Sequence, residues 1–262
     1  MVRKISLILF TTLALTSIVN ASSDGEIILK KNDPSEISDC SETFNRASFA
    51  FNQVLDGIIF QPVASAYRVL PSPVKTGVNN SLNNISNLIT IPNNLLQGDF
   101  AKAGENTGRF LINSTVGLLG LIDVAQFIGL TEYEKEDYGQ SLAKHGVGPG
   151  CYLVVPVLGP STIRDVTGSA LNFLGGDAWY NVTVRNDTRY FSDFDYYSSK
   201  VTGGVDFRAK NYDSIENLEK NSLDFYASVK SLYLQDRQQK ILNTKKIVNT
   251  QNDSDWESIE ND

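Results

Sequence analysis

The side chains that could carry out chemistry are few and widely spaced in this sequence. A Ser–His–acid arrangement would have to use His145, the single histidine of the chain, as its base. No G-x-S-x-G motif presents a serine to it. One histidine and two distant cysteines, Cys40 and Cys151, also lack the close spacing of a zinc site. We therefore predict a protein that is not an enzyme and uses no cofactor or metal; a hydrolase built on Ser161 and His145 is the alternative.

A glycine-rich stretch at 146–150 has a superficial likeness to a phosphate-binding loop. It reads Gly-Val-Gly-Pro-Gly and lacks the lysine and hydroxyl residue of the G-x-x-x-x-G-K-[ST] pattern. Pro149 also removes one of the amide groups with which such a loop holds phosphate. The stretch therefore indicates a turn.

The charge balance and the first residues restrict the partners and the compartment. A formal net charge of −7 without a basic cluster excludes nucleic acid as a partner and adhesion to anionic lipid through a polybasic patch. Arg3 and Lys4 precede an apolar run that ends at a small-x-small site around Ala21, which predicts a signal peptide at residues 1–21. An uncleaved N-terminal anchor is the alternative. Either interpretation exports the rest of the chain to a compartment where the two cysteines could pair, and the sequence leaves that pairing open.

The exported chain is interpreted as one domain between two polar segments. Residues 22–37 predict a flexible leader, residues 38–242 a helical domain, and residues 243–262 an acidic, disordered tail. Hydrophobic residues make up 41% of the chain and charged residues 20%, which suffices for a folded core.

Hydrophobic spacing predicts amphipathic helices in this domain. Apolar residues recur every three or four positions from Phe44 to Ile58, while Asn45, Asn52 and Asp56 share another face. Prolines and capping residues then set the limits of the other elements. We expect, in order, a helix over 74–90 ended by Ile91-Pro92, a helix capped by Asp99, a strand at 153–155, a turn at 156–160, a helix from Ser161 or Thr162 to Leu174, an irregular aromatic stretch at 176–200, and one amphipathic helix from Ile215 to Leu232.

The stretch Leu111–Leu130 is the most hydrophobic part of the exported chain, and it is interrupted by Asn113, Asp123 and Gln126. A charged residue at the centre of a membrane costs roughly 2.5–3.5 kcal/mol. Three interpretations stay open: a buried core helix, a helix that lies in one leaflet or lines a polar lumen, and a simple spanning helix. In the second of these, Asp123 and Gln126 would face a hydrated cavity.

Short motifs in a fixed order resemble the VacJ/MlaA family from about Asp39 to Arg237, nearly the whole exported chain. Each motif alone is unspecific, whereas their order is specific. They are Glu42-Thr43-Phe44-Asn45-Arg46, Pro92-Asn93-Asn94-Leu95-Leu96-Gln97-Gly98-Asp99, Gly108-Arg109-Phe110-Leu111-Ile112-Asn113, Gly120-Leu121-Ile122-Asp123-Val124-Ala125, Asp137-Tyr138-Gly139-Gln140, His145-Gly146-Val147-Gly148, Pro156-Val157-Leu158-Gly159-Pro160-Ser161, Arg164-Asp165, and Tyr233-Leu234-Gln235-Asp236-Arg237.

The resemblance implies an all-α fold, a single ring-like bundle of amphipathic helices around a polar channel with few or no strands. It implies a protein on the periplasmic side of the outer membrane that removes mislocalised phospholipid from the outer leaflet. The lipid would pass to a periplasmic carrier of an ABC transport system, and trimeric porins would be partners. A porin-associated structural protein that carries no lipid is the alternative. The residues implied in the structurally sensitive first helix are Phe44, Asn45 and Arg46; those implied along the lipid path are Asn113, Asp123, Gln126, Gly146, Gly148, Pro156, Gly159, Arg164 and Asp165.

Two departures from the family pattern bear on attachment and on the ring. The predicted cleavage site carries Val19-Asn20-Ala21-Ser22 instead of an acylated cysteine, so we expect attachment through amphipathic helices or partners. Cys40 stands where the family more often has proline. A bond from Cys40 to Cys151 would be particular to this chain and would constrain the ring.

Overall fold

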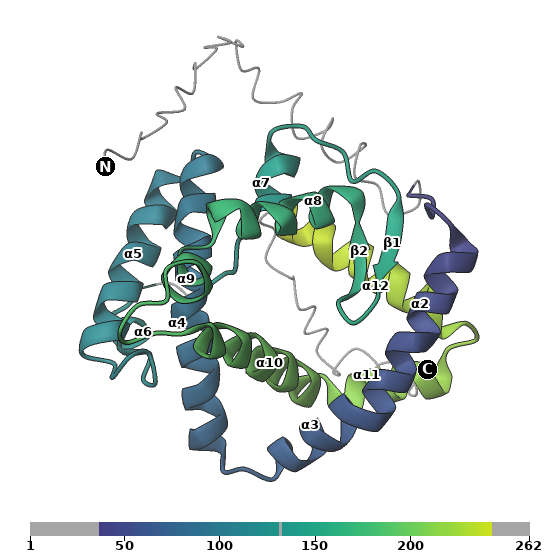
Figure 1. Ribbon diagram of the computed structural model, residues 1–262, viewed down its shortest axis with the longest axis horizontal. Helices are drawn as coiled ribbons and strands as arrows, with labels where there is room; N and C mark the ends of the chain where they lie inside the picture. Colours follow the sequence, from purple (N-terminus) through teal and green to yellow (C-terminus); the bar gives the residue numbers. More distant parts are fainter. Residues whose placement is uncertain (1–36, 131–132, 243–262) are drawn as a thin grey trace, which may run out of the picture.

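The computed structural model describes residues 37–130 and 133–242. The predicted signal peptide at 1–21, the leader up to residue 36 and the acidic tail at 243–262 lie outside the described residues. Within them, the helices are arranged as a ring, and the chain also forms one antiparallel pair of short strands (Figure 1). The predicted all-helical, ring-like fold with few strands is therefore confirmed.

The elements of the described chain are, in order, α2 (Glu42–Leu55), the π-helical turn η2 (Asp56–Phe60), α3 (Gln61–Arg68), α4 (Ser72–Leu96), α5 (Phe100–Thr115), α6 (Val124–Phe127), α7 (Tyr138–Lys144), β1 (Tyr152–Val155), β2 (Gly159–Thr162), α8 (Ile163–Leu171), the π-helical turn η3 (Asn172–Gly176), α9 (Ala178–Tyr180), the π-helical turn η4 (Asn181–Arg185), α10 (Asp193–Lys210), α11 (Tyr212–Asn221) and α12 (Phe225–Leu242).

Two predicted helix limits are confirmed and one is wrong. The Asp99 carboxylate accepts the Lys102 amide at 3.0 Å and caps α5, as expected. The Thr162 side chain caps α8 in the same way. Pro92, however, lies inside α4 rather than at its end. Proline removes only the backbone bond to the Leu88 carbonyl, and the helix continues for one more turn to Leu96.

The stretch Leu111–Leu130 is neither a buried core helix nor a spanning helix. Helix α5 ends at Thr115, and a tight turn through Leu118 and Leu119, with φ of 53° and 59°, leads to the short helix α6. Leu119 is 78% exposed and Phe127 is 82% exposed, so the stretch is not sealed inside the protein. In residues 37–130 and 133–242, we find no helix with the length and apolar content needed to cross a membrane.

Two predictions for the second half of the chain are corrected. The aromatic stretch at 176–200 is largely helical, because the Ser192 and Asp195 side chains form a capping box that starts α10. The single helix predicted from Ile215 to Leu232 is two helices. The chain is extended at Ser222, where ψ is 140°, and the Asp224 carboxylate accepts the Ala227 amide at 3.1 Å where α12 begins.

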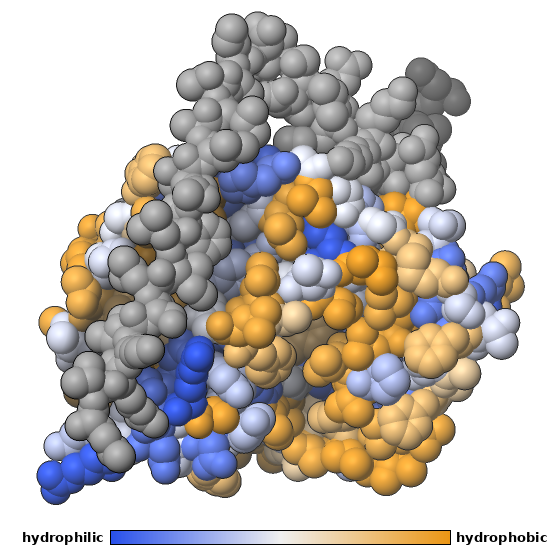
Figure 2. Space-filling model, turned by 45° about the horizontal axis from the view of Figure 1, so that its top comes forward, coloured by the Kyte–Doolittle hydropathy of each residue, from blue (hydrophilic) through white to orange (hydrophobic). Residues whose placement is uncertain are grey.

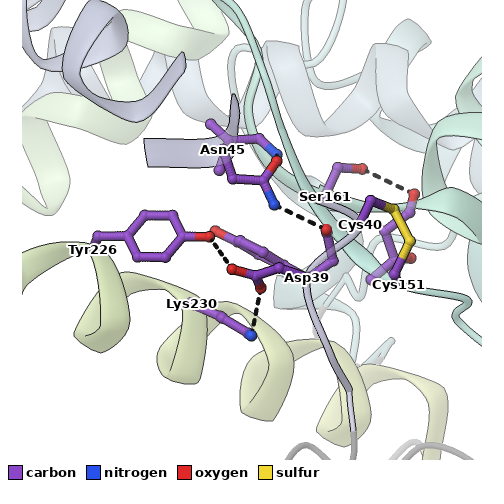
Figure 3. Close-up of a disulfide and its surroundings, with 10 residues drawn as sticks. Asp39, Cys40, Asn45, Cys151, Ser161, Tyr226 and Lys230 are labelled. Carbon is purple, nitrogen blue, oxygen red and sulfur yellow. Dashed lines mark hydrogen bonds and ion pairs between the residues drawn. A yellow bond between two sulfur atoms is a disulfide. The ribbon is translucent and has the colours of Figure 1, made fainter. Parts of the chain in front are cut away.

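A small apolar core lies where the two ends of the domain meet the strand pair. Its buried members are Tyr152 and Val154 of β1 and Tyr226 and Leu234 of α12. Beside it, Cys40 and Cys151 form a disulfide with Cα atoms 5.1 Å apart. Figure 3 shows the Asp39 carboxylate next to this disulfide, with the Tyr226 hydroxyl donating at 2.6 Å and Lys230 at 2.5 Å. We call this core and its disulfide the disulfide-linked end.

Candidate functional site: a polar interior in an apolar ring

Helices α4 and α5 form an antiparallel hairpin whose inner surface is polar. Buried residues on α4 recur at helical spacing of three and four, and those on α5 do the same. Because this spacing brings side chains onto one helix face, the two faces meet as a continuous stripe of amides. This stripe, the polar seam, consists of Asn84, Asn87, Thr90 and Asn94 of α4 and Asn106, Arg109 and Asn113 of α5.

Hydrogen bonds across the polar seam hold the two helices together. The Asn106 side chain donates to Asn94 Oδ1 at 2.8 Å, and the Asn84 side chain donates to the Ser114 hydroxyl at 2.8 Å. Gly120 closes the far end, where a Cβ atom would lie 2.5 Å from the Asn84 Cβ atom. The Oδ1 atoms of Asn84 and Asn87 are buried and accept no hydrogen bond from the described chain. The seam therefore has spare acceptors for water or a polar ligand.

The Asp123 carboxylate accepts hydrogen bonds from two residues of α5 at the end of the hairpin. Arg109 donates to it at 2.5 Å and Asn113 at 2.8 Å. Asn113 Oδ1 in turn accepts the Ala125 amide at 2.9 Å. The structure thus brings two of the predicted path residues, Asn113 and Asp123, into contact, whereas Gln126 is exposed on α6. Their role along a lipid path stays a prediction.

Helix α2, the turn η2 and the α5–α6 segment expose many apolar side chains. Figure 2 shows apolar side chains over a broad area of one face of the molecule. Exposing leucine, isoleucine and phenylalanine to water is unfavourable by about 25 cal/mol per Å² of apolar surface, so such a large exposed set indicates contact with lipid or protein. The exposed apolar set on α2, η2 and the α5–α6 segment is Phe44, Phe51, Val54, Ile58, Ile59, Leu111, Val116, Leu118, Leu119, Leu121, Ile122, Phe127 and Ile128.

The first helix repeats this arrangement, because its polar face turns inward. Asn45 is fully buried; its side chain donates to the Tyr152 carbonyl at 3.0 Å and accepts the Val154 amide at 2.9 Å (Figure 3). Two turns on, the Asn52 side chain makes the same pair of bonds to Val155 and Val157, at 3.1 and 2.7 Å. The sequence placed Asn45 and Asn52 on one face and did not predict what that face binds.

The neighbours of Asn45 have different surroundings. Phe44 is 56% exposed. The Arg46 guanidinium lies 4.4 Å from the Tyr226 ring centroid and donates to both oxygens of Asp224, the shorter bond being 2.6 Å. Arg46 therefore ties the first helix to the start of α12, and the structural sensitivity of this helix stays a prediction.

The glycine- and proline-rich residues predicted along the path form turns. Gly146 and Gly159 have φ of 80° and 86°, values that glycine adopts without strain. Pro156 is exposed, next to the tip of the strand pair, and Gly148 is half-buried. Gly146 and Gly148 lie between α7 and β1, and Pro156 and Gly159 lie at the turn of the strand pair, whereas Asn113 lies on α5 and Asp123 just before α6.

Arg164 and Asp165 belong to a buried ion network that the sequence did not reveal. Asp165 accepts Arg164 at 3.1 Å, Arg237 at 2.9 Å and the Tyr233 hydroxyl at 2.7 Å. Arg237 also donates to both oxygens of Asp137 at 2.6 Å. Burial raises the pKa of the Asp137 carboxyl, but the Arg237 guanidinium outweighs it and holds that pKa below its usual value. The network joins α7, α8 and α12, and an Asp-Arg pair a hundred residues apart carries no local sequence signal.

The histidine and serine of the hydrolase alternative have separate partners. His145 Nδ1 lies 2.8 Å from the Ser141 carbonyl oxygen, and the Ser161 hydroxyl lies 3.4 Å from the Thr162 carbonyl oxygen. Within the described residues, no hydrogen bond joins His145 to Ser161. The geometry therefore gives this alternative no support.

A helical ring with amides on its inside and leucines on its outside defines a class of proteins that work in contact with lipid, with a polar interior shielded from it. The chain belongs to the MlaA lipoprotein family, whose model matches residues 37–240.

The relatives of the chain agree with this assignment. It is 32% identical over 228 residues to the intermembrane phospholipid transport system lipoprotein MlaA of Escherichia coli K12, covering 85% of this chain and 84% of that one. The protein of the same name from Haemophilus influenzae is 29% identical over 250 residues, covering 92% and 90%. A protein of Rickettsia prowazekii is 37% identical over 199 residues, 75% of each chain.

One solved structure has the same fold. It was described under the heading "Structural basis for maintenance of bacterial outer membrane lipid asymmetry". Its TM-score is 0.65 at 33% sequence identity, and the match covers 78% of this chain and 99% of that one.

Proposed function

We propose that this chain is an outer-membrane component of intermembrane phospholipid transport. In this role it removes mislocalised phospholipid from the outer leaflet and passes it to a periplasmic carrier of an ABC transport system. Membership of the MlaA lipoprotein family supports the proposal, and so do relatives named for intermembrane phospholipid transport. It is a task of binding and release, for which no catalytic group is needed.

The observation that carries the proposal is the combination of polar side chains inside the ring with apolar side chains exposed outside it. A phospholipid needs an apolar surface for its tails and a hydrated path for its head group. The exposed apolar set supplies the first, and the buried amides of the polar seam, with spare acceptors on Asn84 and Asn87, supply groups that suit the second. The described helices are too short or too polar to span the bilayer. We therefore propose that the ring lies within one leaflet, on the periplasmic side of the outer membrane, held there by its apolar exterior.

Trimeric porins and a periplasmic lipid carrier complete the proposal as partners. A porin would cover part of the apolar exterior, and the carrier would meet the ring from the periplasm. A structural protein that binds porins without carrying lipid would need the apolar exterior, but the polar seam would then have no function in binding.

Lipid retention and transfer distinguish these two roles. The full chain is extracted from membranes in mild detergent, and its bound phospholipid is counted by mass spectrometry. We expect about one phospholipid or more per chain, and accumulation of outer-leaflet phospholipid in cells that lack the chain. The matched control is Asn221→Leu, on the exposed end of α11, against Asn87→Leu in the seam, which we expect to lower retention. A chain that carries no phospholipid and whose loss leaves the outer leaflet unchanged would be the structural protein instead.

A further inference from the structure

A positively charged cavity lies on the ring at the start of α4. It has a volume of about 310 Å³ and opens between the end of α3, the start of α4 and the last turn of α10. Cationic side chains from all three helices line it: Arg68, Lys75 and Lys210. The hydroxyls of Ser72 and Thr76 lie beside them, and Asp206 is its only acidic lining residue.

The acidic groups at this cavity do not cancel its charge. Asp206 is buried and already engaged, because one oxygen accepts the Tyr67 hydroxyl at 3.0 Å and the other lies 2.8 Å from Lys210 Nζ. Asp213 pairs with Arg68 at 2.7 Å. Three cations therefore face two carboxylates, and the site stays positive in a chain whose net charge is −7.

Two of the three cations can take another anionic partner. Lys75 Nζ donates to the Arg68 carbonyl at 3.0 Å, and in the described residues it has no carboxylate within ion-pair distance. Arg68 donates to both oxygens of Asp213, at 3.0 and 2.7 Å, but the Asp213 side chain is 73% exposed, so water screens the pair and other anions compete for the guanidinium. Arg68 can therefore exchange that carboxylate for a phosphate, which its planar guanidinium also binds through two hydrogen bonds.

Helix α4 adds uncharged donors to the same cavity. Ser72 and Thr76 are one turn apart on its first turns, and in the described chain neither hydroxyl bonds another protein group. The helix has 25 residues, so the positive end of its dipole also lies at this cavity. Cations, hydroxyls and a helix N-terminus together fit one ligand group, a phosphate.

The chain between α3 and α4, next in sequence to the lining residues, exposes apolar side chains, and this decides what carries the phosphate. Val69 is 85% exposed, and Leu70 and Val74 are exposed beside it, in the same turn that presents Arg68 and Lys75. A free anion would make no favourable contact with these apolar side chains, whereas the acyl chains of a lipid would cover them and remove them from water. We propose that this cavity binds the phosphodiester of a phospholipid, with the acyl chains on Val69, Leu70 and Val74. The inference rests on the proposed function and assigns it a head-group site on the outside of the ring.

Charge reversal at Lys75 tests the site on the full chain in detergent micelles containing phosphatidylglycerol. We expect Lys75→Glu to raise the Kd of phosphatidylglycerol at this site about tenfold, as for loss of one charge-assisted bond plus a repulsion. Lys75→Arg should bind as the parent does. Lys240→Glu is the matched control, because Lys240 is a half-exposed lysine on α12, outside the cavity. All variants should share the melting temperature of the parent, since Lys75 is at the surface.

The outcomes separate this inference from the proposed function. Equal loss in Lys75→Glu and Lys240→Glu would overturn the site while leaving transport intact. A parent chain that binds no phospholipid would overturn the proposed function. Diacylglycerol, which has no phosphate, should not compete for the site, and competition by it would contradict phosphate recognition. If inorganic phosphate alone displaced the bound phosphatidylglycerol, the cavity would be a site for the free anion, and the proposal of a phospholipid ligand would be wrong.

Discussion

The disulfide-linked end and the α4–α5 hairpin lie in one ring and are packed in opposite ways. At the disulfide-linked end, Tyr152, Val154, Tyr226 and Leu234 form an interior like that of a water-soluble domain. In the hairpin, amides occupy the interior, and leucines such as Leu119 face outward. The two regions therefore gain stability from different sources. The disulfide-linked end relies on apolar burial and a cross-link, and the hairpin relies on directional hydrogen bonds and a lipid environment.

Removing the cross-link should have the largest effect on this comparison. The disulfide joins residues 111 positions apart, and closing a loop of that length restricts the unfolded chain by about 4–5 kcal/mol. We expect the Cys40→Ser, Cys151→Ser double variant to lose about that much free energy of unfolding. Chemical denaturation with and without reductant measures it. The two cysteines are the only ones in the chain, so reductant should leave the double variant unchanged; a loss under about 1 kcal/mol would contradict the prediction.

The same substitution in the two regions should give different results. Leu234 is 4% exposed at the disulfide-linked end, and Leu119 is 78% exposed next to the hairpin. Leu234→Ala should cost about 2–5 kcal/mol because it opens a cavity, whereas Leu119→Ala should change stability by less than about 0.5 kcal/mol. Equilibrium unfolding of both variants in the same detergent is the measurement. Equal losses would mean that the turn after α5 is buried.

An apolar substitution in the polar seam should destabilise the protein, although the replaced side chain is buried. Asn94 accepts the Asn106 side chain at 2.8 Å, so Asn94→Leu leaves a buried donor without a partner, at a cost of about 1–3 kcal/mol. Asn221→Leu, at an exposed position, is the control. Stabilisation by Asn94→Leu would show that the hairpin interior prefers apolar packing, and the contrast between the regions would then be lost.

Acid should weaken the helices α7, α8 and α12, the last of which belongs to the disulfide-linked end, before the hairpin. Burial raises the pKa of Asp165, but the Arg237 and Arg164 guanidiniums outweigh it and lower that pKa, as Arg237 does for Asp137. A carboxyl whose folded pKa is depressed stabilises the fold above its unfolded pKa, about 3.9, and loses that contribution as the pH falls further. We expect the free energy of unfolding to fall progressively below about pH 4, and Asp137→Asn to reduce this slope.

Hydrogen exchange locates that acid effect. Protection should decrease first in α7, α8 and α12, which the Asp137–Arg237–Asp165 network joins. The hairpin seam consists mainly of amides that do not titrate, so α4 and α5 should keep their protection. Earlier loss in α4 would contradict this order.

The sequence predicted the helices better than it predicted which way they face. Period 3.6 divides a helix into two faces and is the same whether the apolar face is inside or outside. The sequence therefore predicted that Phe44 and Phe51 share one face of a helix, but not that this face is exposed. For the same reason it left open whether Leu111–Leu130 is buried. The resemblance to a membrane-associated family, rather than periodicity, favoured the outward orientation.

Long-range partners account for most of what the sequence did not reveal at the site. Asn52 could be placed beside Asn45 on one helix face, but both bind a strand pair a hundred residues later. The ion pair between Arg237 and Asp137 could not be predicted from a single sequence, because nothing in the local pattern links the two residues. Capping is local, and Asp99 was correctly predicted because its donor is three residues away. Pro92 was wrongly taken as a helix end, since a proline near the C-terminus of a helix removes one backbone bond without stopping the helix.

The smallest effect on stability should accompany a large effect on membrane attachment. Leu119 and Phe127 are 78% and 82% exposed on the turn after α5 and on α6, so replacing both with serine removes apolar surface that is mostly uncovered by the described residues. Unfolding in detergent should change by less than about 0.5 kcal/mol. Partition into phospholipid vesicles should fall about tenfold or more, because each apolar side chain contributes on the order of 1.5–3 kcal/mol when it leaves water. Leu119→Met with Phe127→Leu keeps the apolar surface and should bind vesicles as the parent does. If the serine variant stayed on the vesicles and lost stability instead, these side chains would be part of an interior, and the ring would be packed alike on both sides.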